Sequence, residues 1–207
     1  MNIVLIGVQG SGKGTQAKLL SQALGLPHIS SGELFRHHIE AKTKLGIIAD
    51  SYINRGYLVA DQYVYEMVNT ELQKHSQGFI LDGFPRTVPQ EKYLLANYQI
   101  DYVFWLELDD AESFRRISAR YHCSQCGADY NLIYKKPQVA GICDLCGGSL
   151  RQRRDDTAEY IRKRQEKFHQ KTRLVFRDKN PDYQLLEVDC SKSVEAIQQK
   201  IFSFIGN

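Results

Sequence analysis

The first residue that could do chemistry is a lysine set among glycines near the start of the chain. The stretch reads Gly7-Val8-Gln9-Gly10-Ser11-Gly12-Lys13-Gly14-Thr15. Backbone without side chains can bring several N–H groups around a polyphosphate, and the Lys13 ammonium can reach the outer phosphates. The apolar run at 3–6 predicts a buried strand, and the apolar spacing at 17–24 predicts a helix. Strand, loop and helix in this order predict a phosphate-binding loop.

The residue that would bind magnesium in this loop is displaced by one position. Ser or Thr usually follows the lysine directly, but here Gly14 does, and Thr15 comes next. Another carboxylate must then serve the metal. The apolar strand at 78–81 ends in Asp82, where phosphate-loop enzymes carry such an acid. We therefore expect Asp82 to bind magnesium through water.

A second group of candidates follows Asp82 in the run Gly83-Phe84-Pro85-Arg86. An arginine on a rigid proline turn can grip a phosphate with its planar, two-pronged guanidinium. Gln90 lies near the start of a helix opened by Pro89, and its amide can pair with the edge of a base.

Four of the five cysteines form two Cys-x-x-Cys pairs, Cys123/Cys126 and Cys143/Cys146. This spacing is typical of a four-cysteine zinc site, although iron suits the same geometry and a disulfide-linked loop is the alternative. Cys190 stands alone, and we expect it to be a small buried residue.

Composition bounds the kind of protein. The chain has 207 residues, of which 43% are hydrophobic and 25% charged, as in ordinary globular proteins. A net charge of +3 is too small to indicate nucleic acid or an acidic membrane. No run approaches the roughly 20 apolar residues of a membrane span. We expect a cytoplasmic protein of one domain with inserts, or two at most, that binds neither nucleic acid nor membrane.

Five apolar strands alternating with helices would position these groups, and they predict an α/β fold with a parallel sheet. The strands are expected at 3–6, 26–30, 78–82, 100–109 and 183–189. Asp61 is expected to cap one helix, Thr157 to cap another, and a helix after 109 is expected to carry both Arg116 and Arg120 on one face. The cysteine segment interrupts this alternation, which marks it as an insert.

Three motifs together resemble the adenylate kinases, which are nucleoside monophosphate kinases, and in particular the bacterial type with a zinc-binding lid. They are Gly-x-x-Gly-x-Gly-Lys-Gly-Thr, Asp-Gly-Phe-Pro-Arg-Thr and the two cysteine pairs. The resemblance implies a phosphate-loop nucleotide fold with a five-stranded parallel sheet flanked by helices. It also implies a core (1–30, 60–120 and 158–207), a small helical acceptor-binding segment (31–59) and the zinc-bearing lid (121–157).

The resemblance also assigns site residues by their match to the family's motifs. Those implied for ATP are Gly10, Ser11, Gly12, Lys13, Gly14, Thr15, Arg116, Arg120, Asp129, Tyr130 and Lys192. Those implied for AMP are Ser31, Arg36, Tyr57, Leu58, Val59, Gly83, Phe84, Pro85, Arg86, Gln90, Arg153 and Arg164. Those implied for catalysis are Lys13, Arg86, Arg120, Arg153 and Arg164. Two positions depart from the family's pattern: Ser31 replaces a threonine and Glu33 an aspartate.

The implied reaction is the reversible, magnesium-dependent conversion of ATP and AMP into two ADP, with a role in adenine nucleotide homeostasis. One structural zinc would be held by the four cysteines, and the family suggests a monomer. A kinase for UMP or CMP is the nearer alternative, although Gln90 and the lid favour AMP. A zinc-ribbon ATPase that binds nucleic acid is the more distant one.

Overall fold

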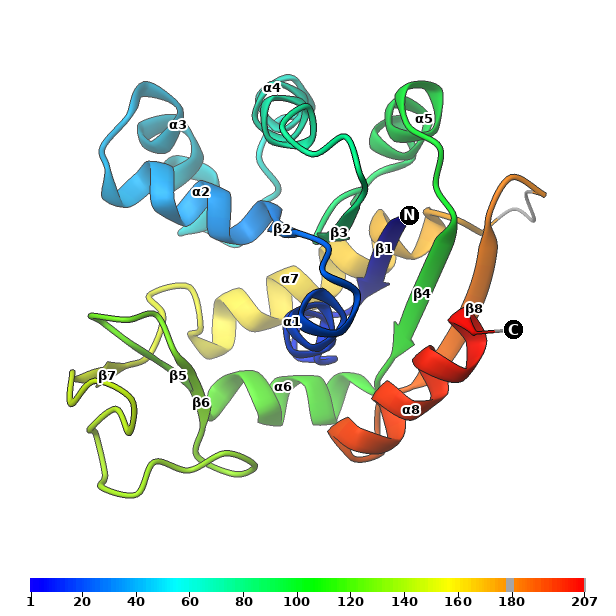
Figure 1. Ribbon diagram of the computed structural model, residues 1–207. Coiled ribbons are helices and arrows are strands. Elements are labelled where there is room, and N and C mark those ends of the chain that lie inside the picture. Colours follow the sequence, from blue (N-terminus) through cyan, green and yellow to red (C-terminus); the bar gives the residue numbers. More distant parts are fainter. Residues whose placement is uncertain (178–180, 207) are drawn as a thin grey trace.

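A computed structural model describes residues 1–177 and 181–206 and shows an α/β fold built on one parallel sheet (Figure 1). The strand order is β2-β3-β1-β4-β8, and every neighbouring pair in it is parallel. The strands are β1 (Asn2–Gly7), β2 (His28–Ser30), β3 (Phe79–Asp82), β4 (Tyr102–Glu107) and β8 (Gln184–Asp189). The predicted parallel sheet of five strands is therefore confirmed.

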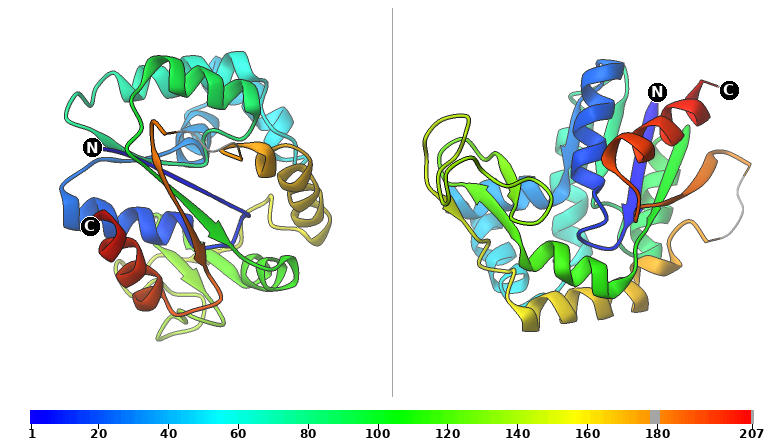
Figure 2. Two further views of the ribbon diagram at one scale, coloured as in Figure 1. Left: turned by 90° about the vertical axis from the view of Figure 1, so that its right-hand side faces the viewer. Right: turned by 90° about the horizontal axis from the view of Figure 1, so that it is seen from below.

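Helices cover both faces of this sheet (Figure 2). The helices of the described ranges are α1 (Lys13–Leu24), α2 (Ser31–Glu40), α3 (Lys44–Ile53), α4 (Asp61–Leu72), α5 (Val88–Asn97), α6 (Asp110–Ser118), α7 (Ala158–Gln170), the short 3₁₀ helix η1 (Thr172–Leu174) and α8 (Val194–Ile205), and not all of them lie against the sheet.

Successive side chains of β1 pack into two different core layers, one on each face of the sheet. Ile3 and Leu5 share one buried cluster with residues of α1 and α8, whereas Val4 and Ile6 share another with residues of α4 and α5. Because successive side chains of a strand point to opposite faces, a continuous apolar run is what a strand covered on both sides requires. Trp105 of β4 is buried in the second cluster, as expected for a core residue.

Two segments extend beyond this core on one side of the molecule, at the left in Figure 1. One carries α2 and α3. The other, which we call the lid (residues 121–157), contains most of a small antiparallel sheet in the order β6-β5-β7. Its strands are β5 (Arg120–Cys123), β6 (Asp129–Asn131) and β7 (Leu150–Arg151).

Several helix ends follow the sequence signals. Gly25 ends α1 in a left-handed conformation, which only glycine adopts without strain, and Thr157 caps α7 by accepting a hydrogen bond from the Tyr160 N–H. No helix in the described ranges, 1–177 and 181–206, is long and apolar enough to cross a membrane.

Two local predictions are wrong. α6 ends at Ser118, and Arg120 lies in β5 opposite Asn131, because antiparallel pairing within the lid begins there. Asp61 does not cap α4: Ala60 precedes the helix, and Asp61 is its first residue. Its carboxylate is used elsewhere, since it accepts a hydrogen bond from Gln90.

Candidate active site

A cavity of about 720 Å³ opens where the phosphate loop, the α2–α3 segment, the lid and α7 meet. It lies at the carboxyl ends of β1 and β3, where ligands of open parallel sheets bind. Every predicted nucleotide-binding residue lines this cavity except Phe84. The Phe84 side chain is fully buried in the core.

The phosphate loop holds its lysine on main-chain oxygens. Lys13 Nζ donates hydrogen bonds to the carbonyls of Gly7 (2.7 Å) and Val8 (2.8 Å). Burial lowers the pKa of Lys13 to about 8, although the Asp82 carboxylate opposes the shift. Gly12 has φ of 94°, a conformation that exposes the loop N–H groups at little cost only for glycine.

Asp82 faces the phosphate loop from the end of β3. A Cβ placed on Gly14 would lie 3.6 Å from Asp82 Oδ2, and the carboxylate is nearly buried. Burial alone would raise the pKa of Asp82, but His28 and Lys13 outweigh it and hold the pKa below the usual value. An ionised oxygen donor beside a phosphate site fits magnesium, which prefers carboxylate, phosphate and water oxygens. Sequence reasoning did not identify the nearby His28, whose Nε2 is 3.8 Å from Asp82 Oδ2.

The carbonyl of Gly83 organises the predicted acceptor side. It accepts hydrogen bonds from Ser31 Oγ and from Arg86 Nε, each at 2.7 Å. A Cβ on Gly83 would lie 2.8 Å from Ser31 Oγ, so a larger residue would disturb this arrangement. Arg86 is held a second time, because its backbone carbonyl accepts a hydrogen bond from Thr172. Burial lowers the pKa of the Arg86 guanidinium.

Gln90 is buried and fixed at both ends of its amide. Its Oε1 accepts a hydrogen bond from the Arg86 N–H at 2.7 Å, and its Nε2 donates one to Asp61 Oδ1 at 2.6 Å. A primary amide has two donor hydrogens and two acceptor lone pairs. One donor hydrogen and one acceptor lone pair of the Gln90 amide are therefore left for a base. The two contacts with the protein fix the direction in which this donor and this acceptor point.

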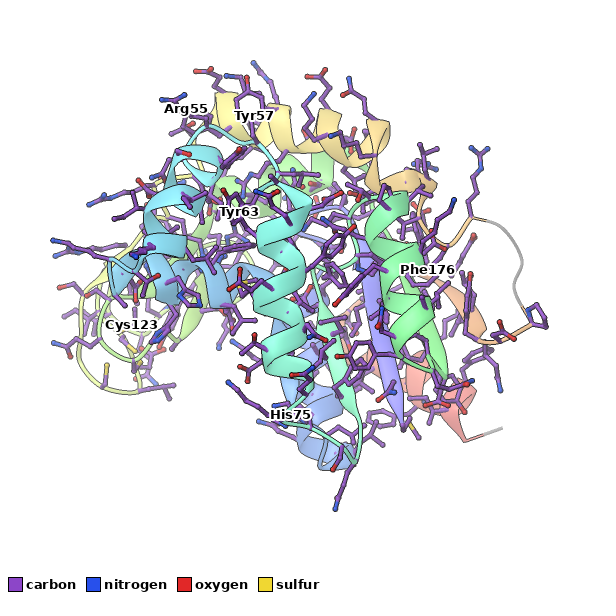
Figure 3. All side chains as sticks on the ribbon, turned by 90° about the horizontal axis from the view of Figure 1, so that it is seen from above. Arg55, Tyr57, Tyr63, His75, Cys123 and Phe176 are labelled. Atoms are coloured by element: carbon purple, nitrogen blue, oxygen red, sulfur yellow. The ribbon has the colours of Figure 1, made fainter. Side chains whose placement is uncertain are left out.

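The segment 56–59 forms the wall of the cavity towards α7. A Cβ on Gly56 would lie 3.2 Å from Lys163 Cβ, so this segment packs closely against α7. Figure 3 shows Arg55 and Tyr57 beside that helix. Val59 is buried, while Tyr57 is exposed, and Tyr57, Leu58 and Val59 all line the cavity.

Three predicted catalytic arginines are held by carboxylates on the lid side. Arg120 makes a two-pronged contact with Asp156, at 2.9 and 2.7 Å. Arg164 donates to the same Asp156 at 2.8 Å and to Asp155 at 3.0 Å, and Arg153 donates to Asp129 at 3.1 Å. The sequence indicated the arginines but not which acid each would contact.

These arginines are close enough to affect one another. Burial first, and then the charges of Arg120 and Arg36, lower the pKa of Arg153 to about 10. Burial likewise lowers the pKa of Arg36. Such crowding of positive charge is unfavourable without anions, so the arrangement suits a ligand that carries several negative charges.

The predicted donor side combines α6 with the lid. Arg116 donates hydrogen bonds to Glu112 at 2.7 Å and to the carbonyl of Cys190 at 3.0 Å, and its guanidinium lies 5.2 Å from the centre of the Tyr134 ring. Sequence reasoning did not identify Tyr134, which also lines the cavity. Lys192 lies on the exposed rim.

The predicted metal ligands gather in the lid. The sulfur atoms of Cys123, Cys126, Cys143 and Cys146 all lie within 4.8 Å of one another, and sulfur atoms cluster near Cys123 in Figure 3. Tetrahedral zinc with Zn–S bonds of about 2.3 Å needs sulfur separations of about 3.8 Å, so the four thiols fit this metal. All five cysteines lie in the described ranges, and none of them forms a disulfide.

Tyr130 links the cysteine cluster to the cavity. Its hydroxyl donates a hydrogen bond to Cys143 Sγ at 3.5 Å and accepts one from the Asp144 N–H. The contact with Tyr130 lowers the pKa of Cys143 to about 6, which favours the thiolate that a metal binds. The Tyr130 hydroxyl is thus used in the lid, although Tyr130 also lines the cavity.

The fold and this cavity place the protein in the phosphate-loop class of nucleotide-binding proteins. Comparison with known proteins narrows the assignment, because the sequence model of the family described as adenylate kinase matches residues 5–179. The chain belongs to the adenylate kinase family, and it is therefore a nucleoside monophosphate kinase.

Similarity to individual relatives extends over the whole chain. The adenylate kinase of Ruminiclostridium cellulolyticum is 37% identical over 213 residues, which cover 100% of both chains. That of Thermosipho africanus is 41% identical over 212 residues, which cover 99% of each chain. That of Clostridium tetani is 40% identical over 214 residues, which cover 100% of this chain and 99% of the relative. Family membership supports the kinase over the zinc-ribbon ATPase alternative.

Proposed function

We propose that the protein catalyses the reversible transfer of a phosphoryl group from ATP to AMP, giving two ADP, and thereby serves adenine nucleotide homeostasis in the cytoplasm. We base this proposal on one observation: the phosphate loop and the pocket around Gln90 line the same cavity. The cluster of Arg120, Arg153 and Arg164 lines it as well. A donor and an acceptor nucleotide in this cavity would meet where positive charge is densest.

The protein supplies position and charge rather than a covalent intermediate. Phosphoryl transfer needs its two oxygens in line and its developing charge neutralised, and little else. Lys13 would bind the outer phosphates of ATP, and Arg86 with Arg36 would bind the AMP phosphate. Arg120, Arg153 and Arg164 would leave their carboxylates to contact the group in transfer. The contacts that these arginines would give up are ion pairs, so a phosphate must compete with the carboxylates of Asp129, Asp155 and Asp156.

Two metals would complete the site. Magnesium, which adenylate kinases use with ATP, would neutralise phosphate charge, and Asp82 would hold its water ligands. Zinc at the four cysteines would have no open coordination position, so its contribution would be structural. The reaction itself would then depend on magnesium and not on zinc.

The predicted division into segments suits this chemistry. Residues 31–59 and 121–157 would close over the nucleotides and exclude water, which would otherwise accept the phosphoryl group. The predicted core, 1–30, 60–120 and 158–207, would stay in place; residues 178–180 and 207 of it lie outside the described ranges. We also propose that the protein acts as a monomer.

A panel of acceptors tests the proposal. ADP formation should be measured with ATP and, in separate reactions, AMP, UMP, CMP, GMP or RNA. We expect AMP to give much the highest kcat/KM. UMP or CMP as the best acceptor would contradict the proposal and favour the pyrimidine kinase alternative, and RNA as the best acceptor would contradict the kinase assignment.

Replacing Gln90 tests the acceptor pocket itself. Gln90→Leu should raise the KM for AMP about tenfold, because losing the amide leaves Asp61 Oδ1, the Arg86 N–H and the edge of the base without their hydrogen-bond partner, while the KM for ATP changes little. Gln62→Leu, at an exposed position of α4, is the matched control. An unchanged preference for AMP over UMP in Gln90→Leu would show that the base is read by other groups.

A further inference from the structure

Lys18 connects three parts of the molecule by contacts that the proposed mechanism does not use. Its Nζ lies 3.0 Å from Asp129 Oδ2 and 3.9 Å from Glu33 Oε1. Lys18 belongs to α1 of the core, Asp129 to β6 of the lid and Glu33 to α2 of the acceptor-binding segment. One ammonium group of the core therefore contacts both the lid and the acceptor-binding segment.

Asp129 relays this contact to Arg153. Its Oδ2 is taken by Lys18, and its Oδ1 accepts a hydrogen bond from Arg153 at 3.1 Å. The Arg153 side chain is only 16% exposed and lines the nucleotide cavity. The like charges of Arg120 and Arg36 repel the Arg153 guanidinium, and the hydrogen bond to Asp129 opposes this repulsion, so the position of the Asp129 carboxylate influences where the guanidinium lies.

We propose that Lys18 is a positioning residue for phosphoryl transfer: by holding one oxygen of Asp129, it leaves only the other oxygen to direct Arg153 into the cavity. This inference rests on the role of Arg153 in the proposed function. Without Lys18, the carboxylate can rotate and present both oxygens to the guanidinium. A two-pronged contact of that kind is stronger, so Arg153 would leave it less readily for a phosphate.

The same contact ties the lid to the core at α1. Lys18 follows Gly14 by four residues and lies on the same side of α1, next to the phosphate loop. A lid held there covers the part of the loop that receives the phosphates. Both partners are about half exposed, so the contact is weak enough to open and close during a catalytic cycle.

Kinetics of three lysine variants test the proposal. Lys18→Met should lower kcat roughly two- to fivefold, the range expected for an exposed ion pair, with smaller changes in the KM values for ATP and AMP. Lys18→Arg should restore most of the loss, because it keeps a cation at this point. Lys74→Met removes another exposed lysine that pairs with an acid, Glu71 of α4, and should leave kcat unchanged. A wild-type kcat in Lys18→Met would overturn the positioning role.

A measurement without turnover tests the contact itself. The Lys18 ammonium is among the groups that hold the pKa of Asp129 below its usual value, together with Arg153 and Arg120, while burial opposes them. Because a two-pronged contact with Arg153 would lower this pKa again, the ¹³C NMR titration of the Asp129 carboxyl should be made in the nucleotide-free Arg153→Ala protein. Adding Lys18→Met there should raise the pKa, whereas adding Lys74→Met should not. An unchanged pKa would show that the contact does not form and would overturn the inference.

A comparison of Arg153→Ala with Lys18→Met distinguishes a failure of this inference from a failure of the proposed function. If Arg153→Ala retained full activity, the role of Arg153 in the proposed function would be wrong, whatever the Asp129 titration showed. If Arg153→Ala lost activity while Lys18→Met kept it, only the positioning role of Lys18 would be wrong.

Discussion

The two sides of the cavity hold their positive charge in different ways. On the phosphate-loop side, Lys13 donates to two main-chain carbonyls of its own loop. On the lid side, Arg120, Arg153 and Arg164 are held by aspartates, some of them distant in sequence: Arg120 and Asp156 are 36 residues apart. The first arrangement is local, whereas the second depends on the lid being folded and in place.

This difference has a chemical consequence. A phosphate that approaches Lys13 competes with neutral carbonyls, whereas one that approaches the arginines competes with carboxylates. In an ion pair the attraction between two opposite charges adds to the hydrogen bond, so the arginines leave their partners less readily than Lys13 does. We therefore propose that the phosphate loop binds ATP first and that the arginines move only when the nucleotides bring enough negative charge.

Removing one lid-side arginine should have the largest effect. Arg164→Ala and Arg153→Ala should each lower kcat by about 10³-fold, the scale of an arginine that neutralises charge in phosphoryl transfer. Arg162→Ala, an exposed neighbour on α7, is the control and should be nearly neutral. Near wild-type turnover in both site variants would remove the lid side from the mechanism.

Metal removal separates the folding of the lid from the chemistry of the core. The lid cluster contains only four buried apolar or cysteine residues, so zinc should be its main source of order. Chelation should lower the melting temperature by about 10 °C, equivalent to roughly 3 kcal/mol for a chain of this size, while some phosphotransfer survives at low temperature. Metal analysis should find about one ion per chain. Complete loss of activity in a folded, metal-free protein would contradict a purely structural role.

The shared carboxylate of Asp156 tests how strongly the lid side is held. Asp156→Asn should destabilise the protein by about 2 kcal/mol in urea unfolding, since Arg120 would keep only a neutral partner at this position and Arg164 would keep Asp155 as its one carboxylate partner. Burial raises the pKa of Asp156, but Arg120 and Arg164 outweigh it and hold the pKa below the usual value. Its stabilising effect should thus be present above the ordinary carboxyl pKa and be lost as pH falls through the lowered one. The exposed pair of Glu159 with Lys163 gives the control, Glu159→Gln, and an equal loss there would contradict the special role of Asp156.

A smaller effect than these is expected from the ionisation of Lys13. Because burial lowers its pKa to about 8, the nucleotide-free protein loses this charge between pH 7 and pH 9. Only the charged form attracts phosphate, so the Kd for ATP should rise about tenfold over this interval. Calorimetric titration of wild type and Lys13→Met would measure it. A Kd that does not change with pH in wild type, or one that changes equally in Lys13→Met, would show that Lys13 is not the group responsible.

The sequence predicted best what lies close together along the chain. A strand followed by a glycine-rich turn and a helix can place Lys13 in only one way, and Cys-x-x-Cys spacing brings two thiols together within one turn. Asp82 likewise follows from its place at the end of a strand. In each case a few consecutive backbone conformations determine the neighbours.

Contacts between distant segments could not be predicted in the same way. Gln90 and Asp61 are 29 residues apart, and Lys18 and Asp129 are 111 apart. Helical spacing suggested that Arg116 and Arg120 share a helix, but pairing of β5 with β6 ends that helix at Ser118. Such contacts depend on how whole helices and strands pack against one another. Residue propensities and the spacing of apolar residues do not determine this packing.

The central claim is that the cavity transfers a phosphoryl group between two nucleotides instead of to water. The most direct test follows ATP, AMP and ADP by ³¹P NMR after ATP and magnesium are mixed with the enzyme, with and without AMP. We predict that two ADP form for each ATP and AMP consumed, that ADP alone regenerates both, and that ATP without AMP is consumed far more slowly. Equal consumption of ATP in the presence and absence of AMP would contradict the claim.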